Sequence, residues 1–233
     1  MSLPTRRPIS RLVLALALGG TALAAVTAAA ATRHGAADRG APTPAADGAA
    51  PPTVGAPAPA FTAVDTRGAQ HSLAAYRGRW VVLEWFNHAC PYTKKHYAAI
   101  DGRPGNTQAM QRDYAGRVVW LSVVSSAAGK QGFTTAEEAD RLTREKGAAP
   151  TAVIRDTAGA LGRLYGARNT PQYAIVDPEG VLRYAGAIDD RRSPRAEDVA
   201  GATNYVRAAL DAGLAGRPIA VAQTEPYGCT VKY

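Results

Sequence analysis

Cysteine is scarce in this chain. Only Cys90 and Cys229 occur among 233 residues, which excludes a small domain held together by several disulfides. Aromatic residues make up only 7%, and long runs of Lys or Arg are absent although the formal net charge is +8. We therefore expect no nucleic-acid partner. The 46% of hydrophobic and 20% of charged residues are typical of a globular protein.

Apolar segments long enough to cross a membrane are also missing. The mainly apolar stretch from Leu12 to Val26 is shorter than the roughly 20 residues that a spanning helix needs. It follows three arginines and precedes the small residues Ala28 to Ala31, an order that is typical of a cleavable export signal. We expect residues 1–31 to be removed after Sec or twin-arginine export, leaving a periplasmic or extracellular protein with no membrane span.

Bulky residues are few between residues 32 and 56, where Ala, Pro, Gly and Thr dominate without apolar periodicity. Such a segment cannot bury enough apolar surface to offset the entropy of ordering it, so we expect a disordered linker. The remaining chain divides into a folded domain at 57–215 and a C-terminal tail at 216–233. This tail carries Cys229 and shows no regular pattern, and we expect it to be flexible.

Short apolar runs alternate with helical patterns in the folded domain, which favours an α/β fold built from βαβ units. Residues 81–86 are expected to be a buried central strand. Cys90-Pro91 should open a helix, because proline is tolerated in a first turn. The capping box at 135–138 predicts a helix to about Gly147. The other predicted elements are strands at 118–123 and 152–154, a helix at 158–165, a hairpin of 172–176 and 181–185, and a last helix from Ser193-Pro194 to about Leu214.

Three features together resemble the thioredoxin fold: a strand ending in Trp85-Phe86, the helix-opening turn Cys90-Pro91-Tyr92-Thr93, and Thr170-Pro171 before a hairpin. The segment NHACPYTKKHY at 87–97 and the terminal YGCTVKY at 227–233 resemble, more narrowly, the peroxiredoxin-like redoxins of the alkyl hydroperoxide reductase and thiol-specific antioxidant superfamily. The resemblance covers about residues 57 to 233. It implies a thioredoxin-like α/β fold with a central mixed β-sheet flanked by helices, and a thiol oxidoreductase that needs no cofactor.

Cys90 is the candidate nucleophile. A thiol reacts as its thiolate, so its ordinary pKa of about 8.5 must fall for reaction near neutral pH. Free backbone amides and the positive end of the helix dipole would face a sulfur at this helix start. Lys94 and His88 would add positive potential and are our predicted thiolate-stabilising residues. The alternative is a buried, inert cysteine.

Two polar residues near Cys90 depart from the motifs of the related families. Thr93 stands where thioredoxins carry a second cysteine, so Cys90 cannot close a local disulfide, but the hydroxyl can hydrogen-bond a thiolate. Asn87 stands at the position of a peroxiredoxin threonine, and the resemblance implies a hydrogen bond from it to a peroxide oxygen. Asn87 and Thr93 therefore join the two cysteines as predicted catalytic residues.

The same resemblance implies a substrate-binding surface. Pro171 matches the cis-proline that thioredoxin-like proteins set opposite the active cysteine, where the backbone of the preceding residue, here Thr170, can pair with a substrate chain. Trp85 and Pro91, on either side of the Cys90 turn, are assigned to this surface as well.

Cys229 has three open roles. As a resolving thiol, it would displace the sulfenic acid or mixed disulfide formed when Cys90 attacks a peroxide or a disulfide. A permanent bridge to Cys90 would instead be structural, and would stabilise the fold by roughly 4 to 5 kcal/mol in the loop-entropy model. Cys229 could also do neither. A flexible tail favours the resolving role, in which Val231 and Tyr233 could dock the tail on an apolar surface.

The leading hypothesis is an exported thiol oxidoreductase acting on a peroxide or a protein disulfide, with a thiol reductant as its partner. A thioredoxin-like module that binds a metal or a peptide without turnover is the alternative, and a fold with a purely structural Cys90–Cys229 disulfide is another. The spacing of His88, Cys90 and His96 is poor for a metal, because His96 lies on a different face of the helix from Cys90. We therefore expect no metal site.

Overall fold

The computed structural model describes residues 51–233. The predicted export signal at 1–31 and most of the predicted linker at 32–56 lie outside them. A five-stranded mixed sheet forms the centre, in the order β5 (Ala152–Arg155), β4 (Val118–Val124), β3 (Trp80–Trp85), β7 (Gln172–Val176) and β8 (Leu182–Gly186). β3 pairs parallel with β4 and antiparallel with β7. This arrangement confirms the predicted α/β class with a mixed central sheet.

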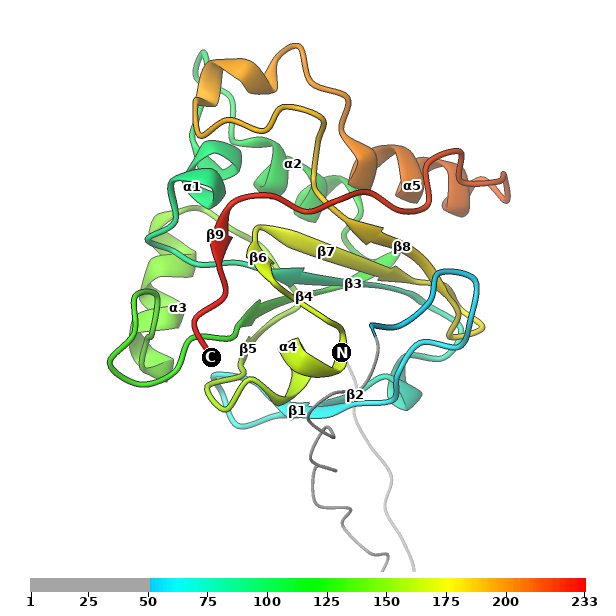
Figure 1. Cartoon of the computed structure of the whole chain (residues 1–233), viewed down its shortest axis with the longest axis horizontal. Coiled ribbons are helices and arrows are strands. Elements are labelled where there is room, and N and C mark those ends of the chain that lie inside the picture. The colour runs from blue at the N-terminus through cyan, green and yellow to red at the C-terminus, as the bar shows by residue number, and fades with distance from the viewer. Residues whose placement is uncertain (1–50) are drawn as a thin grey trace, which may run out of the picture. The chain divides into compact units, whose positions relative to one another are not determined.

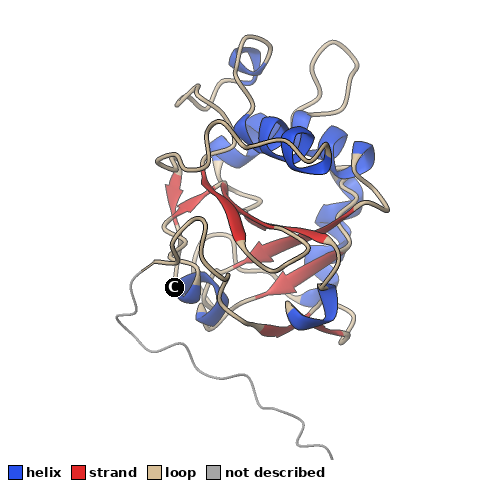
Figure 2. Ribbon diagram, turned by 90° about the vertical axis from the view of Figure 1, so that its right-hand side faces the viewer, coloured by secondary structure: helices blue, strands red, loops and turns tan. Residues whose placement is uncertain are grey.

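Helices cover both faces of this sheet, as Figures 1 and 2 show. One face carries α1 (Pro91–Tyr97), α2 (Asn106–Asp113) and α5 (Tyr205–Leu214). The other carries α4 (Ala160–Leu164) and a hairpin of β1 (Thr62–Val64) and β2 (Gln70–Ser72), while α3 (Ala136–Glu145) lies beside β5. The short elements are η1 (Ala74–Tyr76), η2 (Ala196–Val199), β6 (Asn169–Thr170) and β9 (Cys229–Thr230). Within residues 51–233, no helix is long and apolar enough to cross a membrane.

Alternation along β3 divides the core into two clusters. Val81, Leu83 and Trp85 point to the face covered by α4 and pack in one apolar cluster, whereas Val82 points to the face covered by α2 and α5. Successive side chains of a strand face opposite sides, so one buried run serves both cores. The predicted central strand at 81–86 is confirmed with a shift of one residue, since β3 spans Trp80–Trp85, and all six predicted residues are buried.

Glu84 is the polar exception on the second face. Its carboxylate is fully buried, and burial raises its pKa, although several donors hydrogen-bond it. A buried carboxylate is tolerated only where donors satisfy it. These donors are the hydroxyls of Tyr97 at 2.8 Å, Ser122 at 3.0 Å and Tyr173 at 3.2 Å, Nε1 of Trp120 at 2.7 Å, and Nε2 of Gln111 at 3.4 Å.

The local signals at element ends are mostly confirmed. The Thr135 half of the predicted capping box opens α3, where the amide of Glu138 donates to the Thr135 hydroxyl at 3.2 Å. The turn at 177–180 joins β7 to β8, and the amide of Gly180 donates to the Asp177 carbonyl at 2.9 Å. Both signals act through local hydrogen bonds, which explains why the sequence alone predicts them.

Two helices differ from the prediction. The prediction of a single helix from Ser193-Pro194 to about Leu214 is wrong. η2 ends at Val199, and α5 begins only at Tyr205. The side chain of Asn204 starts α5 anew by accepting a hydrogen bond from the Arg207 amide at 2.9 Å. α2 was not predicted, because its buried side chains are mainly polar. They are Thr107, Gln108, Met110 and Gln111.

The C-terminal tail is docked along the folded domain, where we expected a flexible segment (Figure 1, orange to red). β9 pairs antiparallel with β6, and the amide of Ala127 donates to the Lys232 carbonyl at 2.7 Å. Val231 and Tyr233 pack against the apolar cluster around Trp85, which confirms that they dock the tail. A few apolar side chains and backbone hydrogen bonds to a strand edge are enough to order a segment that has no periodicity.

Candidate active site

Cys90 lies between the end of β3 and the start of α1. Its own backbone is extended, Pro91 occupies the first helical position, and the Lys94 amide donates to the Cys90 carbonyl at 2.9 Å. Proline fits there because the first helical amides have no partner inside the helix. The Cys90 side chain has no exposed surface. The turn therefore fixes a buried sulfur at a helix N-terminus.

Thr170 and Pro171 lie against this sulfur. The peptide bond between them is cis, and the Cys90 thiol donates to the Thr170 carbonyl at 3.2 Å. Thr170 also pairs with Cys229 in the β6–β9 register. The predicted residues Cys90, Thr170, Pro171 and Cys229 are thus brought together from three distant parts of the chain.

The two cysteines are free thiols in contact, with opposite pKa shifts. Burial acts to raise the pKa of Cys90, but hydrogen bonds from the Cys229 thiol, the Thr93 amide, the Thr170 side chain and the Cys229 amide outweigh it and lower that pKa. The pKa of Cys229 is raised to about 12 by burial, by its hydrogen bond to Cys90 and by the negative charge there. Because two close thiols cannot both ionise easily, Cys90 is the one that ionises first, and Cys229 stays a thiol.

The other two predicted catalytic residues, Asn87 and Thr93, differ in their hydrogen bonding. The side chain of Asn87 accepts from the Ala89 amide at 2.8 Å and donates to the Gln131 carbonyl at 3.3 Å, so it shapes the turn before Cys90. Thr93 is buried, and its hydroxyl finds no hydrogen-bond partner among residues 51–233. It is the Thr93 backbone amide that lowers the pKa of Cys90.

Lys94 and His88 were predicted to place two positive charges near the Cys90 sulfur, but the structure does not show this arrangement. Lys94 is exposed to solvent. His88 is buried with its ring edge-on to Phe86, and burial, with the charge of Lys146, lowers its pKa to about 4. At neutral pH the imidazole is therefore uncharged. Hydrogen-bond donors, rather than these two side chains, are the main groups that lower the pKa of Cys90.

The predicted substrate-binding residues Trp85 and Pro91 differ in their exposure to solvent. Trp85 is only 1% exposed and packs against Tyr165, with ring centroids 5.7 Å apart. Pro91 is exposed on the first turn of α1. The structure thus places Trp85 in the core beneath the site and Pro91 at its rim.

A buried polar cluster beside the thiols was missed by the sequence reasoning. It consists of Tyr227, Lys95, Asp189 and His96, and we call it the Tyr227 anchor. Asp189 gives no signal in the sequence, because it lies 94 positions from Lys95 and in an irregular segment. The one available clue was that Tyr227 stands two residues before Cys229.

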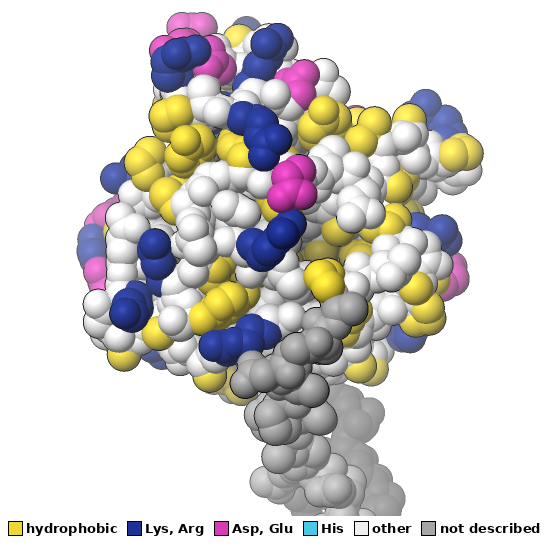
Figure 3. All heavy atoms as spheres, viewed as in Figure 1, with side chains coloured by type: hydrophobic (Ala, Val, Ile, Leu, Met, Phe, Trp, Pro, Cys, Tyr) yellow, Lys and Arg dark blue, Asp and Glu magenta, His cyan; other side chains and the backbone are white. Residues whose placement is uncertain are grey.

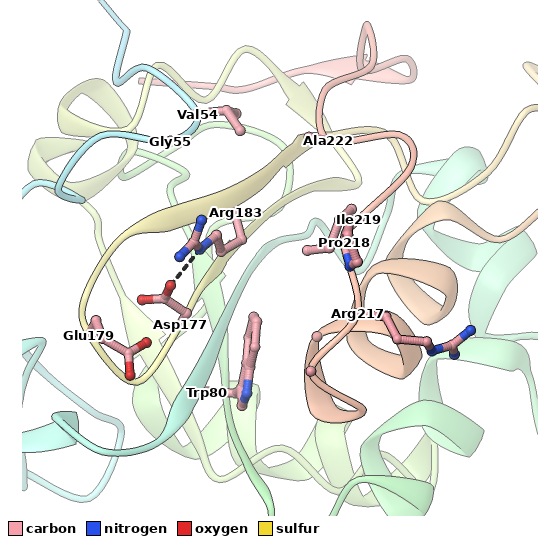
Figure 4. Close-up of a pocket in the computed structure, with 12 residues that line it drawn as sticks. Val54, Gly55, Trp80, Asp177, Glu179, Arg183, Arg217, Pro218, Ile219 and Ala222 are labelled. Atoms are coloured by element: carbon pink, nitrogen blue, oxygen red, sulfur yellow. Dashed lines mark hydrogen bonds and ion pairs between the residues drawn. The ribbon is translucent and has the colours of Figure 1, made fainter.

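The cavity at the start of β3 and the surface charges in Figure 3 do not form part of the site around the two cysteines. A cavity of about 470 Å³ lies at the start of β3, where Trp80, Arg183 and Asp177 line it, whereas Cys90 follows the other end of that strand (Figure 4). On the face in Figure 3, Lys and Arg side chains are scattered between apolar and uncharged areas. Among the described residues, no group of three His, Cys, Asp or Glu could hold a metal ion.

A strand leading to a helix-start cysteine, opposite a cis-proline on a mixed sheet, defines a redoxin with a thioredoxin-like fold. Residues 54–185 match the family model described as "AhpC/TSA family", and the chain belongs to that family. None of the curated proteins matches the sequence. The family membership supports a redoxin-type thiol oxidoreductase.

Two solved structures share the fold over most of their length. A hypothetical protein from Sinorhizobium meliloti is 23% identical, with a TM-score of 0.65, over 79% of this chain and 96% of that one. An uncharacterized conserved protein from Geobacillus kaustophilus is 25% identical, with a TM-score of 0.64, over 78% of this chain and 92% of that one. Neither description names an activity, so these likenesses support the fold.

Proposed function

We propose that this protein is an exported thiol oxidoreductase in which Cys90 reduces hydroperoxides and Cys229 resolves the product. The observation that supports this most is the placement of the two cysteines: Cys229 pairs with Thr170 in the β6–β9 register, and the Thr170 carbonyl oxygen lies 3.2 Å from the Cys90 sulfur. The pKa of Cys90 is lowered and that of Cys229 is raised, which fits the two roles. A nucleophilic thiolate and a neutral partner thiol are what such a sequence of steps requires. Export is supported by the basic, apolar and small-residue order of residues 1–31.

The chemistry has three steps in one turnover. The Cys90 thiolate attacks one peroxide oxygen, the O–O bond breaks, and the departing alkoxide or hydroxide takes up a proton. The sulfur is thereby oxidised to a sulfenic acid, and the hydroperoxide is reduced to an alcohol or to water. The Cys229 sulfur then displaces water from the sulfenic acid, which leaves a Cys90–Cys229 disulfide. A dithiol reductant returns both cysteines to thiols by exchange.

The docked tail favours a small oxidant over a protein disulfide. β9 already pairs with β6 at Thr170, and Cys90 has no exposed surface. A polypeptide substrate would have to displace β9 in order to pair with the Thr170 backbone, because a strand edge accepts one partner. A hydroperoxide has only to reach the Cys90 sulfur and needs no strand edge to pair with.

Intact-mass measurement of three proteins tests this function. With one equivalent of hydrogen peroxide, the wild type should lose two hydrogens as the disulfide forms. Cys229→Ser should gain one oxygen at Cys90, and Cys90→Ser should stay unchanged. A wild type that hydrogen peroxide leaves unmodified, or a Cys229→Ser protein that gains no oxygen at Cys90, would contradict the proposal.

A further inference from the structure

The Tyr227 anchor joins the tail to the buried part of α1. The side chains of Lys95 and Asp189 have no exposed surface, and Lys95 Nζ lies 3.1 Å from Asp189 Oδ2. The Tyr227 hydroxyl donates to Asp189 Oδ1 and accepts from Lys95 Nζ at 3.3 Å. His96 Nε2 lies 3.4 Å from the same hydroxyl. The phenol oxygen is therefore held on three sides.

Burial restricts the Tyr227 side chain to one position. A buried ion pair costs free energy to desolvate, and that cost is offset only where the donors and acceptors are well placed. The Lys95 ammonium group also donates a hydrogen bond to the Arg191 carbonyl at 2.6 Å. A displaced Tyr227 would leave both Lys95 and Asp189 short of a partner in a medium where water cannot replace it. One position of the phenol is thus strongly preferred.

The anchor is adjacent to both thiols along the chain. Lys95 is on α1, which begins directly after Cys90, and Tyr227 stands two residues before Cys229. Gly228 makes the link tight, since its φ is +123° and a β-carbon there would collide with the Thr170 carbonyl oxygen. The position of the phenol therefore fixes where the Cys229 sulfur lies relative to the Cys90 sulfur.

We propose that Tyr227 is a positioning residue that, through Lys95 and Asp189, holds the Cys229 sulfur against Cys90 for the disulfide-forming step. This inference rests on the proposed function. In that step the Cys229 sulfur bonds to the Cys90 sulfur, the S–O bond of the sulfenic acid breaks, and the departing hydroxide and the thiol proton form water. Tyr227 takes no part in the bonds that form or break in this step, and it acts only by placing the Cys229 sulfur.

The test measures how the sulfenic acid partitions. Full-length protein receives one equivalent of hydrogen peroxide at a fixed dimedone concentration, and intact mass gives the ratio of dimedone adduct to internal disulfide. This ratio does not depend on how fast the sulfenic acid forms, so it isolates the step that Tyr227 is proposed to assist. Tyr227→Phe removes the hydrogen bonds that the hydroxyl makes with two charged partners, Asp189 and Lys95, and should raise the ratio by at least about tenfold.

Tyr233→Phe is the matched control. It removes the hydroxyl of the other docked tail tyrosine, which donates to the Ala167 carbonyl at 2.6 Å, away from α1. Its ratio should stay within about twofold of the wild type, since only a neutral hydrogen bond is lost. An unchanged ratio in Tyr227→Phe, or an equal rise in both variants, overturns the inference. A wild type that gives neither adduct nor disulfide refutes the proposed function instead.

A second variant covers the case in which Tyr227→Phe does not fold. The double substitution Lys95→Met and Asp189→Leu removes the ion pair but keeps Tyr227, and replacing a buried pair by apolar residues is often neutral for stability. It should raise the adduct-to-disulfide ratio in the same direction. A folded double variant with the wild-type ratio also overturns the inference.

Discussion

The tail is fixed on either side of Cys229 by two anchors of opposite composition. Upstream, the Tyr227 anchor is a buried group of charges and hydrogen bonds. Downstream, Val231 enters the apolar cluster, and the Tyr233 ring fills the space left by two glycines, Gly159 and Gly162. Apolar burial favours docking without specifying direction, whereas buried hydrogen bonds specify one geometry. Apolar burial thus helps to hold the end of the tail, and buried hydrogen bonds align it at Tyr227.

The largest expected effect comes from breaking the charged anchor on one side. Lys95→Met leaves the Asp189 carboxylate buried without its cation, and we expect the free energy of unfolding to fall by about 3 to 5 kcal/mol. Urea unfolding followed by tryptophan fluorescence measures this. Lys94→Met is the matched control, because Lys94 is the exposed neighbour, and its effect should stay within about 0.5 kcal/mol. Equal effects of the two substitutions would show that the buried pair adds nothing.

A smaller effect is expected at the apolar anchor. Gly162→Ala in α4 would ordinarily stabilise a helix, but here the new methyl group would collide with the Tyr233 hydroxyl. We expect a loss of about 1 to 3 kcal/mol, the usual cost of overpacking. Gly201→Ala, where a β-carbon meets open space, is the control for thermal unfolding. A stabilised Gly162→Ala protein would mean that Tyr233 does not rest on α4.

The sequence predicted those parts of the site that depend on local patterns. Cys90 at a helix start follows from a strand, a turn and Pro91, and these signals act over a few residues. The place of Thr170-Pro171 followed from the family resemblance. The docking of Val231 and Tyr233 was predicted because apolar side chains in a polar tail need a surface to cover.

The polar contacts between distant segments could not be predicted. We expected Lys94 to add positive potential at Cys90, yet Lys95 is the buried lysine, because the rotation of α1 is set by packing on the sheet and by Asp189. Trp85 was assigned to substrate, but alternation along β3 turns it into the core. Whether a polar side chain is buried depends on a partner far along the chain, and spacing alone does not reveal that partner.

The smallest expected effect concerns Cys229, which lies between the two anchors of the tail. Cys229→Ala removes the thiol that donates to the Cys90 sulfur but keeps the backbone amide that also does so. Both donors stabilise the thiolate, so the pKa of Cys90 should rise in Cys229→Ala and rise further when residues 229–233 are deleted. The rate of Cys90 alkylation by iodoacetamide as a function of pH measures this, and its midpoint should move to higher pH in that order. A midpoint that stays fixed in both variants would mean that the docked tail does not activate the thiolate and that α1 alone lowers its pKa.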